Sequence, residues 1–76
     1  MTREDKLMQQ ILRAIYWKQF TNMQRRDILE IIKYDENGHG AATSICDYLN
    51  IERRGNRAEL TPIINNYLQT EKEEPK

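Results

Sequence analysis

The sequence has too few cysteine and histidine residues for a disulfide or for the common zinc sites. Cys46 is the only cysteine and His39 the only histidine among 76 residues. A single thiol cannot form a disulfide within the chain, which favours a reducing, cytoplasmic setting over secretion. One cysteine and one histidine make neither a zinc site nor a catalytic pair. We therefore expect no metal, no cofactor and no enzymatic activity.

Long apolar runs and an excess of positive charge are missing as well. No run of about 18 apolar residues occurs, so the sequence predicts no membrane span, and the charged start, Thr2–Lys6, does not resemble a signal peptide. Twelve Lys and Arg balance twelve Asp and Glu. The protein thus lacks the overall positive charge that attracts nucleic acid nonspecifically.

Apolar residues spaced three and four positions apart are abundant, which is typical of helices packed around a core. Thr2 and Asp5 resemble a capping box and predict a first helix over about residues 3–19. The face of this helix expected to point inward comprises Leu7, Met8, Ile11, Leu12, Ile15 and Tyr16.

Aromatic residues gather at the end of this first helix, as Tyr16, Trp17 and Phe20. We interpret the group as core packing. Trp17 and Phe20 lie partly off the apolar face. A chain of this length buries little surface by itself, so a homodimer through the N-terminal helix remains open.

Capping and turn signals divide the middle of the chain. Thr21 and Gln24 repeat the capping signature and predict a second helix that ends near Tyr34. Two glycines and an Asn-Gly pair predict a loop over residues 35–40. A third helix is expected over residues 41–49, and Asn50 is a suitable terminator. Its inward residues would be Ile45, Tyr48 and Leu49, with the small Ala42 and Cys46 where another helix approaches.

Pro62 interrupts the last apolar pattern. A proline inside a helix costs roughly 3 kcal/mol. Either Thr61 is the N-cap and Pro62 the first helical residue, or the helix starts near Arg57 and Pro62 lies about one turn in. The inward face comprises Leu60, Ile63, Ile64, Tyr67 and Leu68 in both cases.

These patterns predict an all-α fold, a small bundle of four helices in a single domain over residues 1–70. Residues 71–76 are charged and are predicted to form a disordered acidic tail. The third helix, the turn after it and the last helix have the order of a helix-turn-helix unit.

Several segments within residues 24–70 resemble the winged-helix transcriptional regulators, in particular the MarR-like group. They are ILEII at 28–32, TSICDYLNI at 43–51 and ELTPII at 59–64, followed by Tyr67 and Leu68. The resemblance implies a sequence-specific regulator whose Leu-Thr-Pro step lies where the recognition helix enters the major groove of double-stranded DNA. No alternating apolar pattern follows Leu68, so the wing is expected to be missing.

Polar residues on the last helix match this interpretation. Arg57, Thr61 and Asn65 recur every four residues and would form one exposed stripe. Arg can bind guanine and Asn can bind adenine through paired hydrogen bonds, so we expect these three to contact base edges. The expected contacts to the DNA backbone come from Arg53, Arg54, Arg25 and Arg26.

The alternative is a protein-binding module, such as an inhibitor, adaptor or antirepressor, that keeps the helix-turn-helix shape but does not bind DNA. Zero net charge, the missing wing and the acidic tail favour it. The two hypotheses differ in one geometric expectation. A DNA regulator requires the arginines around the last helix to form one continuous cationic surface, with the carboxylates pointing elsewhere.

Overall fold

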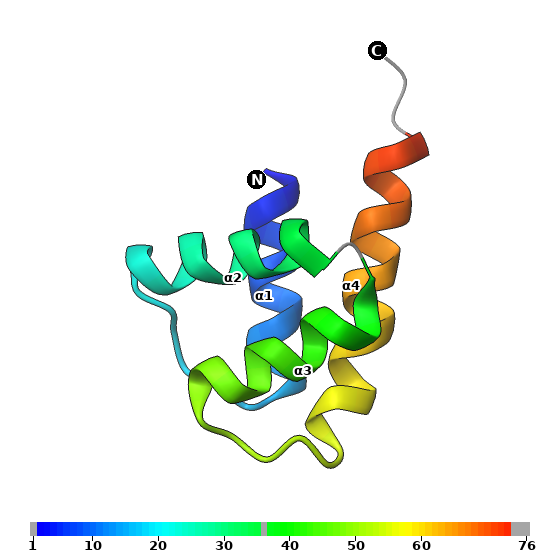
Figure 1. Cartoon of the computed structure of the whole chain (residues 1–76). Helices are drawn as coiled ribbons and strands as arrows, with labels where there is room; N and C mark the ends of the chain where they lie inside the picture. The colour runs from blue at the N-terminus through cyan, green and yellow to red at the C-terminus, as the bar shows by residue number, and fades with distance from the viewer. Residues whose placement is uncertain (1, 36, 74–76) are drawn as a thin grey trace.

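Four helices account for most of the described chain, residues 2–35 and 37–73, in this computed structural model (Figure 1). The described residues contain no strand, and the predicted all-α fold of four helices is confirmed. The helices are α1 (Arg3–Ala14), α2 (Asn22–Asp35), α3 (Gly38–Leu49) and α4 (Asn56–Glu73).

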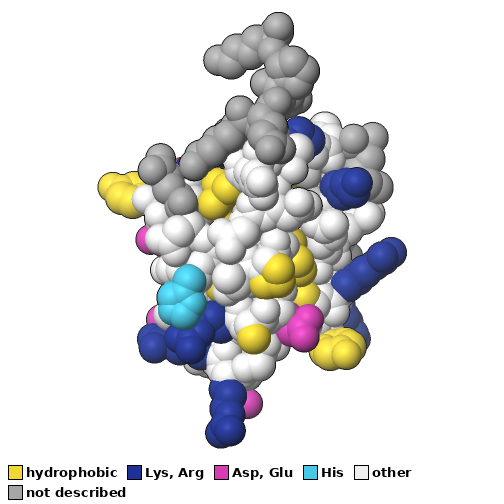
Figure 2. All heavy atoms as spheres, turned by 90° about the vertical axis from the view of Figure 1, so that its right-hand side faces the viewer, with side chains coloured by type: hydrophobic (Ala, Val, Ile, Leu, Met, Phe, Trp, Pro, Cys, Tyr) yellow, Lys and Arg dark blue, Asp and Glu magenta, His cyan; other side chains and the backbone are white. Residues whose placement is uncertain are grey.

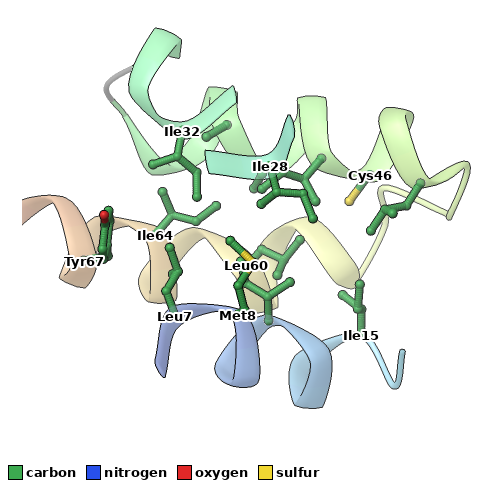
Figure 3. Packing of buried hydrophobic residues seen from close by; sticks show 14 of the residues in the cluster. Leu7, Met8, Ile15, Ile28, Ile32, Cys46, Leu60, Ile64 and Tyr67 are labelled. Carbon is green, nitrogen blue, oxygen red and sulfur yellow. The ribbon is translucent and has the colours of Figure 1, made fainter. Parts of the chain in front are cut away.

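The last helix, α4, lies between α1 on one side and the α2–α3 pair on the other (Figure 3). The contact between α3 and α4 is the most extensive, and α1 packs on α4 while α2 packs on α3. All four helices contribute apolar side chains to one core, and those of α1, α3 and α4 come mostly from the predicted inward faces. Its fully buried side chains include Leu7, Met8, Ile11, Ile28, Ile32, Ile45, Leu60 and Ile64.

Both predicted capping signatures are present. The Thr2 hydroxyl accepts a hydrogen bond from the amide of Asp5 at 3.0 Å. Thr21 and Gln24 form the reciprocal pair, in which the Gln24 amide donates to Thr21 Oγ1 at 3.1 Å and the Thr21 amide donates to Gln24 Oε1 at 2.9 Å. These bonds satisfy amides that a helix start otherwise leaves without partners.

Helix α1 is shorter than predicted, because it ends at Ala14 rather than near residue 19. The chain reverses there: the Trp17 amide donates to the Leu12 carbonyl at 2.9 Å, and Tyr16 has a left-handed backbone with φ 57°. The expectation that Tyr16 lies in the core is wrong, since its side chain is 94% exposed. The reversal instead brings Phe20 into the core and leaves Trp17 half-buried against it.

Helix α3 starts earlier than predicted, at Gly38 instead of residue 41. Asn37 is its N-cap, and its Oδ1 accepts from the Gly40 amide at 2.7 Å. Asn50 ends the helix with φ 59°, as predicted. The expectation that Tyr48 points inward is wrong, since its side chain is 40% exposed.

Helix α4 runs without interruption through Pro62, which confirms the second of the two alternatives for the proline. Thr61 is therefore not a cap, and its hydroxyl donates to the Arg57 carbonyl at 2.7 Å. The helix continues to Glu73, into the segment predicted to be a disordered tail. The rest of that predicted tail, residues 74–76, lies outside the described residues.

Candidate functional site

The predicted base-reading stripe on α4 lies against the start of α3. Asn65 Oδ1 accepts a hydrogen bond from the Gly38 amide at 2.8 Å. A Cβ atom at position 38 would come within 2.5 Å of both Asn65 Oδ1 and the Thr61 carbonyl oxygen. The Thr61 hydroxyl is bound to the Arg57 carbonyl. The Asn65 side chain thus bonds to α3 and the Thr61 hydroxyl bonds within α4, although Asn65 remains exposed.

Two of the arginines predicted to contact phosphates have carboxylate partners. Arg53 Nε and Nη2 donate to the two carboxylate oxygens of Asp47 at 2.8 and 2.7 Å. This pairing lowers the pKa of Asp47 and raises the pKa of Arg53. Arg25 forms an ion pair with Asp5 that joins α2 to α1 and lowers the pKa of Asp5. Both ion pairs place negative charge beside the predicted phosphate contacts.

The remaining predicted arginines differ in their exposure to solvent: Arg26 and Arg54 are exposed, and Arg57 is half-buried. Figure 2 shows the face that carries α4. On this face the Lys and Arg side chains lie in separate groups near the rim, with uncharged surface between them and Asp or Glu side chains beside some of them. The described residues on this face do not form one continuous cationic surface.

A groove between α2 and α3 is lined by negatively charged side chains. Its volume is about 430 Å³, and no lysine or arginine is among the described residues that line it. Tyr34 is one of its lining residues and is 92% exposed. We call this site the α2–α3 groove; its lining residues are Asp27, Glu30, Ile31, Tyr34, Asp35, Ser44 and Tyr48.

Hydrogen bonds across the groove hold two of its carboxylates. The Tyr48 hydroxyl donates to Asp27 Oδ2 at 2.7 Å, and this bond raises the pKa of Tyr48. The Ser44 hydroxyl donates to Asp35 Oδ2 at 3.3 Å. Glu30 is exposed on the α2 side. The groove therefore combines fixed negative charge with exposed tyrosine rings.

The α2–α3 groove is not among the sequence-based predictions, because the apolar spacing places Tyr48 in the core and Tyr34 at a helix end. A signal was present on each helix. Asp27, Glu30 and Tyr34 share one face of α2 at spacings of three and four, and Ser44 and Tyr48 are four apart on α3. The way the two helices face each other is a tertiary feature that neither spacing contains.

A second surface hollow surrounds the end of α1, and it is cationic. No acidic residue is among its described lining residues. The Trp17 indole donates to the Gln19 carbonyl at 3.1 Å, and its ring centroid lies 6.2 Å from that of Phe20. We call this site the α1 end surface; it is lined by Gln9, Leu12, Arg13, Tyr16, Trp17 and Lys18.

Other site classes have little support in the described part of the chain. It contains no group of three or more His, Cys, Asp and Glu side chains arranged to hold a metal ion. None of its helices combines the length and the apolar character needed to cross a membrane. Cys46 is buried, as predicted, and burial raises the pKa of its thiol.

Comparison of the chain with protein-family models, curated proteins and solved structures finds no match. The resemblance to winged-helix regulators therefore stays a prediction.

Proposed function

We propose that the protein is a protein-binding module that receives a cationic segment of a protein partner in the α2–α3 groove. The observation that carries the proposal is the composition of that groove. Two tyrosine rings and Ile31 lie among three carboxylates, and no basic residue is among the described lining residues.

Each kind of lining residue has a distinct role in such binding. Aromatic side chains supply much of the binding free energy at protein interfaces, because they bury a large area at little cost in side-chain entropy. Carboxylates select the sign of the partner's charge and speed its approach. A lysine or arginine from the partner can pair with Glu30 while it lies over the ring of Tyr34.

The same charges argue against a DNA regulator. Carboxylates of the groove repel phosphates, and the chain has no net positive charge to offset them. Arg53 is paired with Asp47, and Asn65 binds the start of α3. These contacts support the protein-binding alternative over direct reading of base edges by α4.

Tyr34 offers a clean test of the groove. Its ring is almost fully exposed, so its removal is expected to change binding and not stability. Fluorescence anisotropy would follow a labelled decapeptide with alternating arginine and leucine, and a matched peptide with glutamate in place of arginine. We expect the cationic peptide alone to bind, and Tyr34→Ser or Glu30→Gln to weaken its binding about tenfold. Met23→Ser removes an exposed apolar residue of α2 outside the groove and serves as the control.

A labelled DNA duplex of random sequence tests the rival function in the same assay. Binding of the duplex that falls steeply with salt, and falls less steeply in the triple variant Arg53→Ala, Arg54→Ala, Arg57→Ala, would favour the DNA regulator. That result, together with no binding of the cationic peptide, would overturn the proposal.

A further inference from the structure

Tyr16 occupies a backbone position that suits glycine. The bond from the Trp17 amide to the Leu12 carbonyl closes the end of α1 in a Schellman-type turn, and Tyr16 is its left-handed residue. Such positions usually hold glycine, because the Cβ of any other residue crowds the backbone there. A tyrosine at this place therefore costs free energy in the folded chain.

No packing of the Tyr16 ring compensates for this cost, since the side chain is 94% exposed. The end of α3 shows the same geometry with a better suited residue: Asn50 has φ 59°, and the Ile51 amide donates to the Cys46 carbonyl at 2.9 Å. Asparagine tolerates the left-handed region far better than an aromatic residue does. A strained backbone that presents an exposed aromatic ring indicates a contact with another molecule.

The charges around Tyr16 complement those of the α2–α3 groove. Arg13 and Lys18 give the α1 end surface two positive charges, and no acidic residue is among its described lining residues. The groove has three carboxylates and no described basic lining residue. The two surfaces are therefore complementary in charge, and each also exposes a tyrosine that can add apolar contact area.

The two surfaces share no described lining residue, and in the core α4 lies between α1 and the α2–α3 pair (Figure 3), so a contact between the surfaces would join two molecules. We infer that the α1 end surface of one copy, led by Tyr16, docks into the α2–α3 groove of a second copy, so that the protein associates head to tail. This inference rests on the proposed function and names the partner of the groove. A head-to-tail dimer still has one free α2–α3 groove and one free α1 end surface. Further copies can bind to these, so association continues into longer assemblies unless a ring closes.

Sedimentation velocity of the full chain, from micromolar to millimolar concentration, measures the association. We expect the wild type to form dimers and larger species, and less of them as salt is raised and the opposite charges are screened. Tyr16→Gly and Tyr34→Ser should each weaken association about tenfold. Asn50→Gly makes the same kind of backbone change away from both surfaces and should associate like the wild type.

An equimolar mixture of the two variants distinguishes head-to-tail contact from a symmetric dimer. Tyr16→Gly keeps an intact groove and Tyr34→Ser keeps an intact α1 end surface, so the mixture should form a one-to-one dimer that does not grow. The inference is overturned by a mixture that stays monomeric while the wild type associates, or by variants that associate as well as the wild type.

A wild type that stays monomeric at every concentration also overturns it. The proposed function is judged separately in that case. Binding of the cationic decapeptide by the monomer would leave the protein-binding role of the groove in place, whereas loss of both would remove the inference and the proposed function together.

Discussion

The amide of Gly38 donates to Oδ1 of Asn65 at 2.8 Å, which joins the first residue of α3 to the middle of α4. The helices approach so closely here that a Cβ at position 38 would lie 2.5 Å from the Thr61 carbonyl oxygen. A carbonyl in the middle of a helix cannot move aside as the end of a flexible side chain can. Glycine is therefore required by the packing of α3 on α4.

Replacement of this glycine is expected to destabilise the protein. Gly38→Ala should lower the free energy of unfolding by about 1–3 kcal/mol, the usual cost of overpacking a closely packed site. Urea unfolding followed by circular dichroism measures the change. His39→Ala, at the exposed neighbouring position, should unfold within about 0.5 kcal/mol of the wild type. Equal midpoints for Gly38→Ala and the wild type would contradict the close approach of the two helices.

Replacement of the strained residue Tyr16 is expected to stabilise the protein, in contrast to replacement of Gly38. Tyr16→Gly should raise the free energy of unfolding by up to about 1 kcal/mol, because glycine accepts the left-handed backbone, although its greater freedom in the unfolded chain offsets part of the gain. Asn50→Gly should raise the free energy of unfolding by less than Tyr16→Gly does, since asparagine already tolerates the left-handed conformation. The measurement is urea unfolding at low protein concentration. A less stable Tyr16→Gly variant would mean that the exposed ring contributes packing after all.

The ion pair of Asp47 with Arg53 predicts a dependence of stability on acid pH. The pair holds the pKa of Asp47 below its ordinary value of 3.8 in the folded protein. Its contribution is therefore present above that ordinary value and is lost as the pH falls through the lowered folded value. Between about pH 5 and about pH 2, the wild type should lose more of its stability than Asp47→Asn or Arg53→Ala.

Urea midpoints measured at each pH test this expectation. Arg54→Ala removes a neighbouring charge without breaking the pair and should keep the pH dependence of the wild type. Parallel pH profiles for the wild type and Asp47→Asn would show that the pair has no effect on folding.

Pro62 predicts that α4 can be made more stable. The proline has no amide to donate to the Ala58 carbonyl four residues earlier, and its ring crowds that turn. Because Pro62 is exposed, its removal costs little packing. Pro62→Ala should raise the free energy of unfolding by about 1–3 kcal/mol in a thermal or urea melt. An unchanged or lower stability would indicate that the packing of Leu60 and Ile64 needs the geometry imposed by the proline.

Much of the fold could be predicted from local signals. The pairs Thr2 with Asp5 and Thr21 with Gln24 located two helix starts, and apolar spacing located the core faces. The end of α1 could not be predicted, because Tyr16 continues the apolar pattern and no glycine marks the reversal. The start of α3 could not be predicted either, because Gly38 has the sequence context of a loop residue. A glycine is needed at position 38 because α4 approaches closely there, and this approach is a tertiary contact.

The candidate site was less predictable than the fold. The sequence identified the arginines but not their carboxylate partners: the left-handed turn at Asn50 brings Arg53 back to Asp47. Asn65 was expected to reach outward, and the position of α3 gives its carbonyl oxygen a partner inside the protein instead. Whether an exposed polar residue binds a ligand or a neighbouring helix depends on the arrangement of the helices.

The position of α4 between α1 and the α2–α3 pair also constrains when the protein can fold during synthesis. Leu60 and Ile64 fill the middle of the core, and α1 packs mainly on α4, so α1 has little to pack on until residues beyond these have left the ribosome, whereas α2 and α3 can already pack on each other. Until then the nascent chain presents Leu7 and Ile11 to its surroundings, where a chaperone can hold them.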